Sequence, residues 1–162
     1  MAPAGPVLTG SSAGTRILEV APGATHGLRR AVLRDGREDA VVVFEGDDEW
    51  ETVHLAAVEP DQRIVGVVTF LERACPVRPG VFPVRQLRGM AVATDRQGSG
   101  LGAQLLAAGL DRCRSEGVDL VWAHARVAAL DFYLANGFTS ESDVYVFGDV
   151  NLPHRTVVAD LS

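Results

Sequence analysis

A glycine-dense segment is the first place in this chain where residue types and spacing could support chemistry. Gln97-Gly98-Ser99-Gly100-Leu101-Gly102 follows an extended apolar run and precedes apolar residues at helical spacing. A turn from a strand into a helix leaves backbone N–H groups without partners at the helix N-terminus, and these groups stabilise an anion. Glycines permit positive φ and let a ligand approach without a Cβ in its way. The segment therefore predicts a site for a phosphorylated cofactor.

Two familiar phosphate motifs fit this segment poorly. A Walker A loop needs a lysine, but all 15 residues counted as Lys+Arg are arginines, which excludes it. Gly98-x-Gly100-x-x-Ala103 matches the dinucleotide fingerprint, which requires an acidic residue at the end of the next strand to hold a ribose. The strand expected over 118–125 has Asp119 at its other end. A nicotinamide-dependent oxidoreductase is therefore a disfavoured alternative.

A third interpretation accounts for more of the chain. Gln97-x-x-Gly100-x-Gly102 resembles the Gln/Arg-x-x-Gly-x-Gly/Ala pyrophosphate loop of the GNAT family of N-acetyltransferases. Ala129-x-x-Phe132-Tyr133-x-x-x-Gly137-Phe138 resembles the family's helix after its fifth strand. One helix and one strand separate the two segments, as in the family. The resemblance extends from about Leu87 to Phe138 and is strongest to a small bacterial subgroup of unassigned substrate.

The resemblance implies an α/β (α+β) fold. Its core is a mixed, mostly antiparallel seven-stranded sheet flanked by helices, in which strands four and five splay apart. The expected strands are 16–20, 53–58, 64–71, 84–92, 118–125, 138–147 and 155–161, and the expected helices are 25–33 with Thr25 as its cap, 100–115 and 128–136. The pattern does not predict the secondary structure of the acidic segment over 37–52. A single acetyltransferase domain over 15–162 is expected to follow a flexible tail over 1–14.

For the cofactor, the resemblance implies acetyl-CoA as co-substrate. The loop N–H groups would hold the pyrophosphate, and the edge of strand four would pair with pantetheine and point one N–H at the thioester carbonyl. Gln97 stands where relatives often have Arg, so neighbouring Arg96 is a candidate for the missing charge. Arg126 stands where many relatives have Asn, and it can donate but cannot accept. The candidate cofactor-binding residues are Met90, Ala91, Val92, Arg96, Gln97, Gly98, Ser99, Gly100, Leu101, Gly102 and Arg126.

For catalysis, the resemblance makes Tyr133 the general acid that protonates the departing thiolate. A buried structural role for the same ring is the alternative. The general base is open: His124 at the end of strand five is one candidate, and with an ordinary pKa near ~6.5 it would give activity that rises through pH ~6–7. The other candidates are Glu51, His54 and His154 on the substrate side, with Glu141 and Asp143, and each competes with a structural or solvated role.

Composition limits the partners. A net charge of −6 and a pI near 5.1 disfavour nucleic acid, and no apolar run approaches the ~20 residues that span a membrane. The N-terminus lacks the basic start and apolar stretch of a signal peptide, so we expect a cytoplasmic monomer or homodimer. Cys75 and Cys113 are expected to be reduced thiols, and no Cys/His spacing predicts a metal site.

These observations favour an N-acetyltransferase that moves an acetyl group from acetyl-CoA directly to an amine of a small molecule or peptide. The main alternative is a non-catalytic acyl-CoA-binding sensor of the same fold. Turnover of any amine would distinguish the two. The sequence leaves open the acceptor and whether the acyl group is strictly acetyl.

Overall fold

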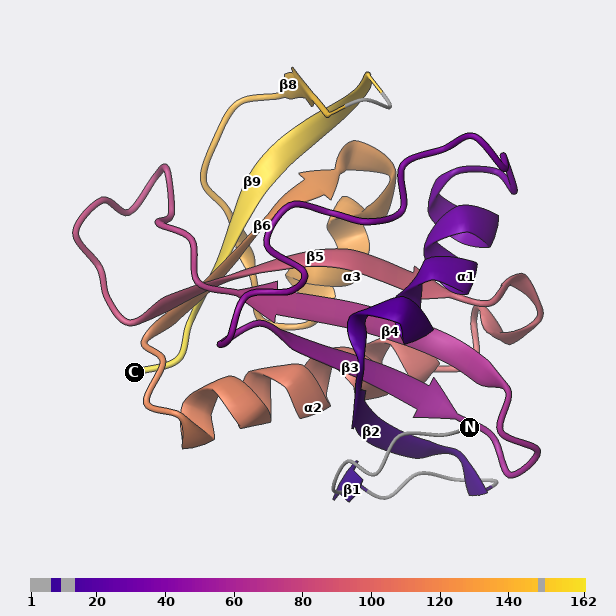
Figure 1. The fold of residues 1–162 in the computed structure, drawn as a ribbon. Helices are drawn as coiled ribbons and strands as arrows, with labels where there is room; N and C mark the ends of the chain where they lie inside the picture. Colours follow the sequence, from indigo (N-terminus) through magenta and orange to yellow (C-terminus); the bar gives the residue numbers. More distant parts are fainter. Residues whose placement is uncertain (1–6, 10–13, 149–150) are drawn as a thin grey trace. The chain divides into compact units, whose positions relative to one another are not determined.

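The computed structural model describes residues 7–9, 14–148 and 151–162, and Figure 1 shows its helices and strands. The strands are β1 Val7–Thr9, β2 Arg16–Val20, β3 Val53–Val58, β4 Ile64–Leu71, β5 Val84–Val92, β6 Leu120–Arg126, β7 Thr139–Ser140, β8 Tyr145–Phe147 and β9 Leu152–Asp160. The α-helices are α1 His26–Leu28, α2 Leu101–Ser115 and α3 Leu130–Ala135. Short helical turns are η2 Pro22–Thr25, η3 Arg29–Leu33, η4 Thr94–Arg96 and η5 Val127–Ala129, of which η3 is π-helical.

The chain divides into two compact units. The first unit comprises Met1–Leu71 and Gly89–Gly109, and the second comprises Glu72–Arg88 and Leu110–Ser162. Strand β5 and helix α2 each run from one unit into the other. The strands described here pair in the order β1-β2-β3-β4-β5-β6-β9-β7, with β8 also on β9.

The first unit is built on an antiparallel meander. Strand β2 pairs with β3 along its whole length, and β3 pairs with β4. Apolar residues of these strands, together with Ala91 of β5, form a core of Leu18, Val20, Ala56, Val58, Val67 and Ala91. Ala24, Leu28, Val32 and Leu33 of the short helical segment pack against this core. The segment contacts β3 and β4 because its apolar residues recur at helical spacing (Figure 1).

The second unit contains the parallel part of the sheet. The start of β5 pairs in parallel with β6, from Val84–Leu120 to Gln86–Trp122. Strand β6 then pairs antiparallel with β9 along its whole length. The core of this unit is Cys75, Val84, Leu120, Trp122 and Val158. The parallel pairing covers three residue pairs, which agrees with the predicted early divergence of the two strands.

Two glycines explain where helix α2 ends and how closely it packs against β4. It ends before Gly117, whose φ of +77° places it in the left-handed region that favours glycine. The Val118 N–H returns to the Cys113 carbonyl at 3.0 Å, which satisfies the last turn. A Cβ at Gly109 would lie 2.2 Å from Phe70 Cζ, so this glycine allows α2 to approach β4 closely.

The mixed, mostly antiparallel sheet with flanking helices is confirmed, and the strand count is corrected from seven to nine among the described residues. The predicted strand 138–147 is two short strands, β7 and β8. Between them the Ser142 hydroxyl accepts the Thr156 N–H at 2.8 Å, which replaces a backbone acceptor and interrupts the ladder. Residues 7–9 of the predicted tail form β1 on β2, whereas 1–6 and 10–13 lie outside the described residues.

Two further details differ from expectation. The segment predicted as one helix over 25–33 consists of 3-10, α and π turns, and Thr25 donates its hydroxyl to the Pro22 carbonyl instead of capping the helix. Residues 37–52 contain turns without a helix or strand. Within the described part of the chain, no helix combines the length and apolarity needed to cross a membrane.

Candidate active site

The glycine loop has the conformation that an anion site needs. Gly98 and Gly100 have φ of +80° and +85°, and a Cβ at either position would meet nothing within 4 Å. Residues 97–100 are exposed, and buried Leu101 begins α2. The N–H groups of the first turn of α2 have no partners inside the helix. The open space at both glycines and the helix N-terminus beside them fit a pyrophosphate group.

Side chains of the loop stabilise its own backbone. The Gln97 Nε2 donates to the Val92 carbonyl at 3.0 Å, and the Ser99 hydroxyl donates to the Arg96 carbonyl at 2.5 Å. Arg96 belongs to a ladder of alternating charges, since its NH2 group lies 2.5 Å from Glu59 Oε1 and Asp95 binds Arg63. The guanidinium of Arg96 must therefore be shared with Glu59 if it is to bind a phosphate.

The segment of β5 before the loop alternates in burial. Ala91 is buried in the core of the first unit, whereas Met90 and Val92 are half-buried. Gly89 has φ of +64°, a conformation found at the first residue of a glycine-type β-bulge. The strand is therefore irregular one residue before Met90, within the strand whose edge is predicted to pair with pantetheine.

Tyr133 lies on α3 in the second unit and is only 7% exposed. Its ring makes edge contacts with Phe132 at 5.3 Å and Phe138 at 5.4 Å between centroids. Gly137, with φ of +93°, ends the helix and lets the Phe138 N–H return to the Tyr133 carbonyl at 3.1 Å. The terminal Gly-Phe of the sequence motif thus packs against the tyrosine.

The protonation state of Tyr133 suits a proton donor. Burial raises its pKa to about 12, and the positive charge of Arg126 at the end of β6 acts in the opposite direction. The phenol therefore keeps its proton throughout the neutral pH range. The Arg126 charge also favours the phenolate that forms when the proton is given up.

His124 lies in an aromatic cluster of the second unit. Its ring stacks on Phe147 at 3.7 Å between centroids, and its Nδ1 lies 2.5 Å from the Tyr145 hydroxyl. The Tyr145 hydroxyl lies 2.9 Å from Thr156 Oγ1, so the three side chains form a hydrogen-bonded chain across β6, β8 and β9. Burial, with a smaller contribution from the charge of His154, lowers the pKa of His124 to about 4.

With this pKa, a proton transfer that uses His124 is expected to depend on pH near 4 instead of near 6–7, and folding stability should also depend on pH. The unfolded chain holds the His124 proton with a pKa near 6.5, so between pH 6.5 and about 4 it binds more protons than the folded chain. Unfolding free energy should therefore fall as pH decreases across this window, by well under about 3 kcal/mol from this group because solvent screens the partly exposed ring. Denaturant titrations at several pH values should show a smaller fall for His124→Phe than for the unchanged protein. Equal slopes would contradict the assigned burial effect.

The remaining candidate bases lie in different surroundings. His54 is buried, with Nδ1 at 2.7 Å from Thr69 Oγ1 and Nε2 at 2.8 Å from the Asp47 carbonyl. His154 is buried and its Nδ1 donates to the Leu152 carbonyl at 2.6 Å. Glu51 and Asp143 are exposed, whereas Glu141 pairs with Arg78 at 2.8 Å. Neither ring nitrogen of His54 faces solvent, which favours its structural role.

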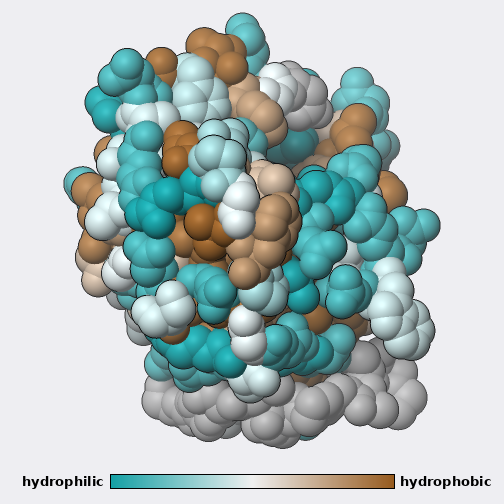
Figure 2. Space-filling model, turned by 90° about the vertical axis from the view of Figure 1, so that its left-hand side faces the viewer, coloured by the Kyte–Doolittle hydropathy of each residue, from teal (hydrophilic) through white to brown (hydrophobic). Residues whose placement is uncertain are grey.

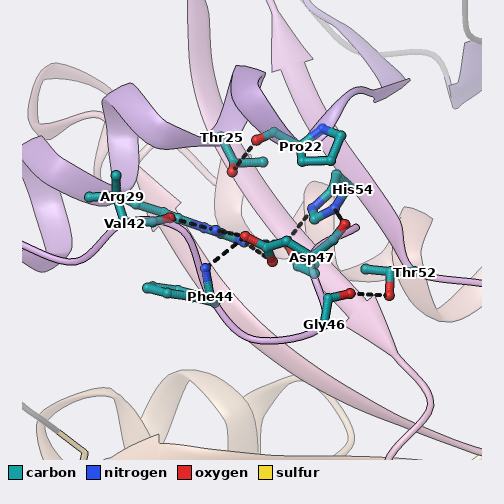
Figure 3. A network of polar contacts seen from close by, with 10 residues as sticks. Pro22, Thr25, Arg29, Val42, Phe44, Gly46, Asp47, Thr52 and His54 are labelled. Atoms are coloured by element: carbon teal, nitrogen blue, oxygen red, sulfur yellow. Dashed lines mark hydrogen bonds and ion pairs between the residues drawn. The ribbon is translucent and has the colours of Figure 1, made fainter. Parts of the chain in front are cut away.

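Two groups of residues were not identified as candidates from the sequence. Tyr145 joins His124 only because β8 folds back on β9, a long-range pairing that no local pattern indicates. Arg29 and Asp47 form a buried ion pair in the first unit (Figure 3). An arginine within the apolar stretch from Leu28 to Leu33 was the available signal for this pair.

The surface carries exposed apolar side chains near these residues. Figure 2 shows apolar patches framed by hydrophilic residues on one face of the molecule. The 37–52 segment exposes Val41, Val43 and Trp50, and Trp50 is 98% exposed. The β8–β9 hairpin exposes Val146, Phe147 and Leu152, among others. These groups are available to contact a ligand or a partner.

The two cysteines are buried thiols without a disulfide partner. Cys75 and Cys113 are free, as predicted, and buried. Burial raises the pKa of both thiols, that of Cys113 to about 12, which disfavours a reactive thiolate. Among the described residues, no three His, Cys, Asp or Glu side chains are grouped so that they could hold a metal ion.

Comparisons with known proteins agree with the fold and show the family. The sequence profile of the acetyltransferase (GNAT) family matches residues 25–138. An acyl-CoA N-acyltransferase from Pseudomonas aeruginosa has a similar structure, with a TM-score of 0.71, 21% identity, and coverage of 90% of this chain and 99% of that chain. No curated protein matches the chain.

Two solved structures of similar fold carry more specific names. An aminoglycoside 6'-N-acetyltransferase complexed with coenzyme A has a TM-score of 0.68 at 14% identity, covering 90% of this chain and 97% of that one. A variant of the spermidine N-acetyltransferase SpeG from Vibrio cholerae has a TM-score of 0.68 at 12% identity, covering 90% and 95%. At these identities the likeness concerns the fold, whereas the sequence profile covers more than half of the chain. The chain therefore belongs to the acetyltransferase (GNAT) family of acyltransferases.

Proposed function

We propose that the protein is an N-acetyltransferase that uses acetyl-CoA and transfers the acetyl group directly to an amine. The observation that carries this proposal is the loop before α2, where two glycines with positive φ leave open space beside a helix N-terminus. Membership of the acetyltransferase family supports the same cofactor. No metal takes part in the proposed reaction.

Acetyl-CoA supplies the acyl thioester, and the residues of this chain have three tasks. Backbone N–H groups over 98–102, with Gln97 holding the loop and Arg96 beside it, bind the pyrophosphate. A backbone N–H of β5 near Met90 or Val92 donates to the thioester carbonyl and stabilises negative charge on its oxygen. The amine forms the new C–N bond, the C–S bond breaks, and Tyr133 gives its proton to the sulfur.

The proton released by the amine goes to a base that is reached directly or through water. His124 stays the first candidate because it is neutral near pH 7 and so can accept a proton, although its low pKa makes it a weak base. Glu51 is the exposed alternative, and His54 and His154 are buried alternatives. Arg126 is proposed to act electrostatically beside Tyr133 and to donate to the cofactor.

The acceptor is proposed to be an amine of a small molecule or a peptide. Two proteins of similar structure are named as an aminoglycoside and a spermidine N-acetyltransferase. Both names refer to amine substrates, which supports an amine acceptor here without identifying it. The cytoplasmic location and the monomeric or dimeric state stay predictions from the sequence.

The experiment that tests the cofactor is a calorimetric titration with coenzyme A and, separately, with NADH. We expect saturable binding of coenzyme A and none of NADH at the same concentrations. Binding of NADH alone would overturn the proposal in favour of an oxidoreductase. Binding of coenzyme A without turnover of any amine would favour the alternative of a non-catalytic acyl-CoA sensor.

A further inference from the structure

A buried arginine of the first unit connects two segments that are distant in sequence. Arg29 is 0% exposed and lies in η3. Its NH1 group donates to the Val42 carbonyl at 2.8 Å and to Asp47 Oδ2 at 2.5 Å (Figure 3). Its NH2 group donates to Asp47 Oδ1 at 3.1 Å and to Thr69 Oγ1 at 2.9 Å. One guanidinium therefore holds the 37–52 segment at two residues, 42 and 47.

The neighbours of this guanidinium complete a closed network. His54 lies 2.7 Å from Thr69 Oγ1 and 2.8 Å from the Asp47 carbonyl, so it holds the same segment by a second route. The Phe44 N–H donates to Asp47 at 2.9 Å, and its ring lies 4.0 Å from the Arg29 guanidinium carbon. Burial raises the pKa of Asp47, but the Arg29 and Phe44 hydrogen bonds and the Arg29 charge outweigh it and lower that pKa.

The other side of the same guanidinium faces the irregular position of β5. A Cβ at Gly89 would lie 3.0 Å from Arg29 Nε, 3.3 Å from Arg29 NH2 and 3.3 Å from the Phe44 ring. The buried Nε has no hydrogen-bond partner, so this face of Arg29 contacts Gly89 by packing alone. Gly89 directly precedes Met90, whose backbone is proposed to meet the thioester. Arg29 and Phe44 therefore occupy the space beside Gly89 that a side chain would need.

We propose that Arg29 is a positioning residue that couples β5 at Gly89 to the 37–52 segment, so that coenzyme A bound along β5 orders this segment beside the reacting thioester. The inference rests on the proposed function, because it assumes that coenzyme A pairs with β5. It follows from one rigid planar group that packs on the strand with one edge and binds the segment with the other. The 37–52 segment has no helix or strand of its own, and the Arg29 bonds hold its middle, whereas Arg30 bonds the Arg37 and Glu38 carbonyls at its start.

The first test uses a double variant, Arg29→Met with Asp47→Leu. Removing only one partner would leave a buried charge unpaired, whereas replacing both by apolar residues is often tolerated. Hydrogen exchange is measured with and without saturating coenzyme A. In the unchanged protein, coenzyme A is expected to slow amide exchange over 42–47 by roughly tenfold. In the double variant this slowing should disappear although coenzyme A affinity stays within about twofold.

The second test is kinetic and uses the best amine found by screening. The double variant is expected to lose roughly tenfold or more in kcat/KM for the amine, because a small misplacement of reacting groups is costly. Arg114→Met is the matched control, since it removes an arginine from an exposed pair with Asp111. Arg29→Lys keeps the charge without the planar fork and is the second variant if the double variant does not fold, with the same loss of coupling expected.

The outcomes separate this inference from the proposed function. Failure of the unchanged protein to bind coenzyme A would overturn both. Normal coenzyme A binding without slower exchange over 42–47 would overturn the coupling alone. Retention of the coupling and of kcat/KM in a folded Arg29 variant would show that the network only supports the fold.

Discussion

Replacing Tyr133 with phenylalanine is expected to lower kcat by roughly 10²–10⁴-fold, the usual contribution of general acid catalysis. The substitution removes only the hydroxyl, so the edge contacts with Phe132 and Phe138 persist and the fold should be kept. Because burial raises the pKa of Tyr133 to about 12, the lost group is a protonated phenol at any pH used for the assay. Steady-state kinetics should show the lower kcat, whereas calorimetry should show an unchanged affinity for coenzyme A.

The only other tyrosine provides the comparison. Tyr145→Phe removes a hydroxyl that bonds His124 and Thr156, and its effect on kcat should be clearly smaller. If kcat of Tyr133→Phe stays within about twofold, single-turnover measurements decide whether a slow later step hides the effect. An unchanged single-turnover rate would make Tyr133 a structural residue.

Gly100→Asp is expected to weaken coenzyme A binding by more than ~10-fold, or at least ~1.4 kcal/mol. Gly100 has φ of +85°, so any L-residue is strained there, and the new side chain enters the open space assigned to the pyrophosphate. The aspartate adds a negative charge where a phosphate should bind. Calorimetry on the folded variant measures the loss.

A matched control distinguishes backbone strain from loss of the site. Gly117 also has a positive φ, +77°, and open space around its Cβ position, but it lies at the other end of α2. Gly117→Asp should lose stability to a similar extent and keep coenzyme A affinity. Equal affinity in the two variants would contradict the placement of the phosphate site at Gly100.

Local features of the sequence were sufficient to predict the loop and the helix that follows it. Glycines at 98 and 100 and at 117 mark positions where φ must be positive, and the apolar residues between them recur at helical spacing. Strand β5 was predicted over its full range because apolar residues and β-branched residues bound it on both sides of Gly89. Each of these signals depends on residues close together in the chain, so it can be recognised in a single sequence.

The environment of the candidate base could not be predicted in the same way. His124 has a low pKa because Tyr145 and Phe147 of β8 cover it, and β8 reaches it through pairing with β9. The sequence predicted one strand over 138–147 and therefore did not predict β8 as a separate strand. The break at Ser142 depends on a bond to Thr156, which is distant in the sequence. Arg29 was missed for a similar reason: its partners Val42 and Asp47 come from a segment without periodic pattern.

The most direct measurement of the central claim is the release of free thiol from acetyl-CoA in the presence of a panel of amines, with mass spectrometry of the products. The proposed function predicts that at least one amine stimulates thiol release, that one acetylated amine forms for each thiol released, and that Tyr133→Phe suppresses both. Saturable coenzyme A binding with no amine-dependent thiol release across polyamines, aminoglycosides, amino acids and peptides would contradict it.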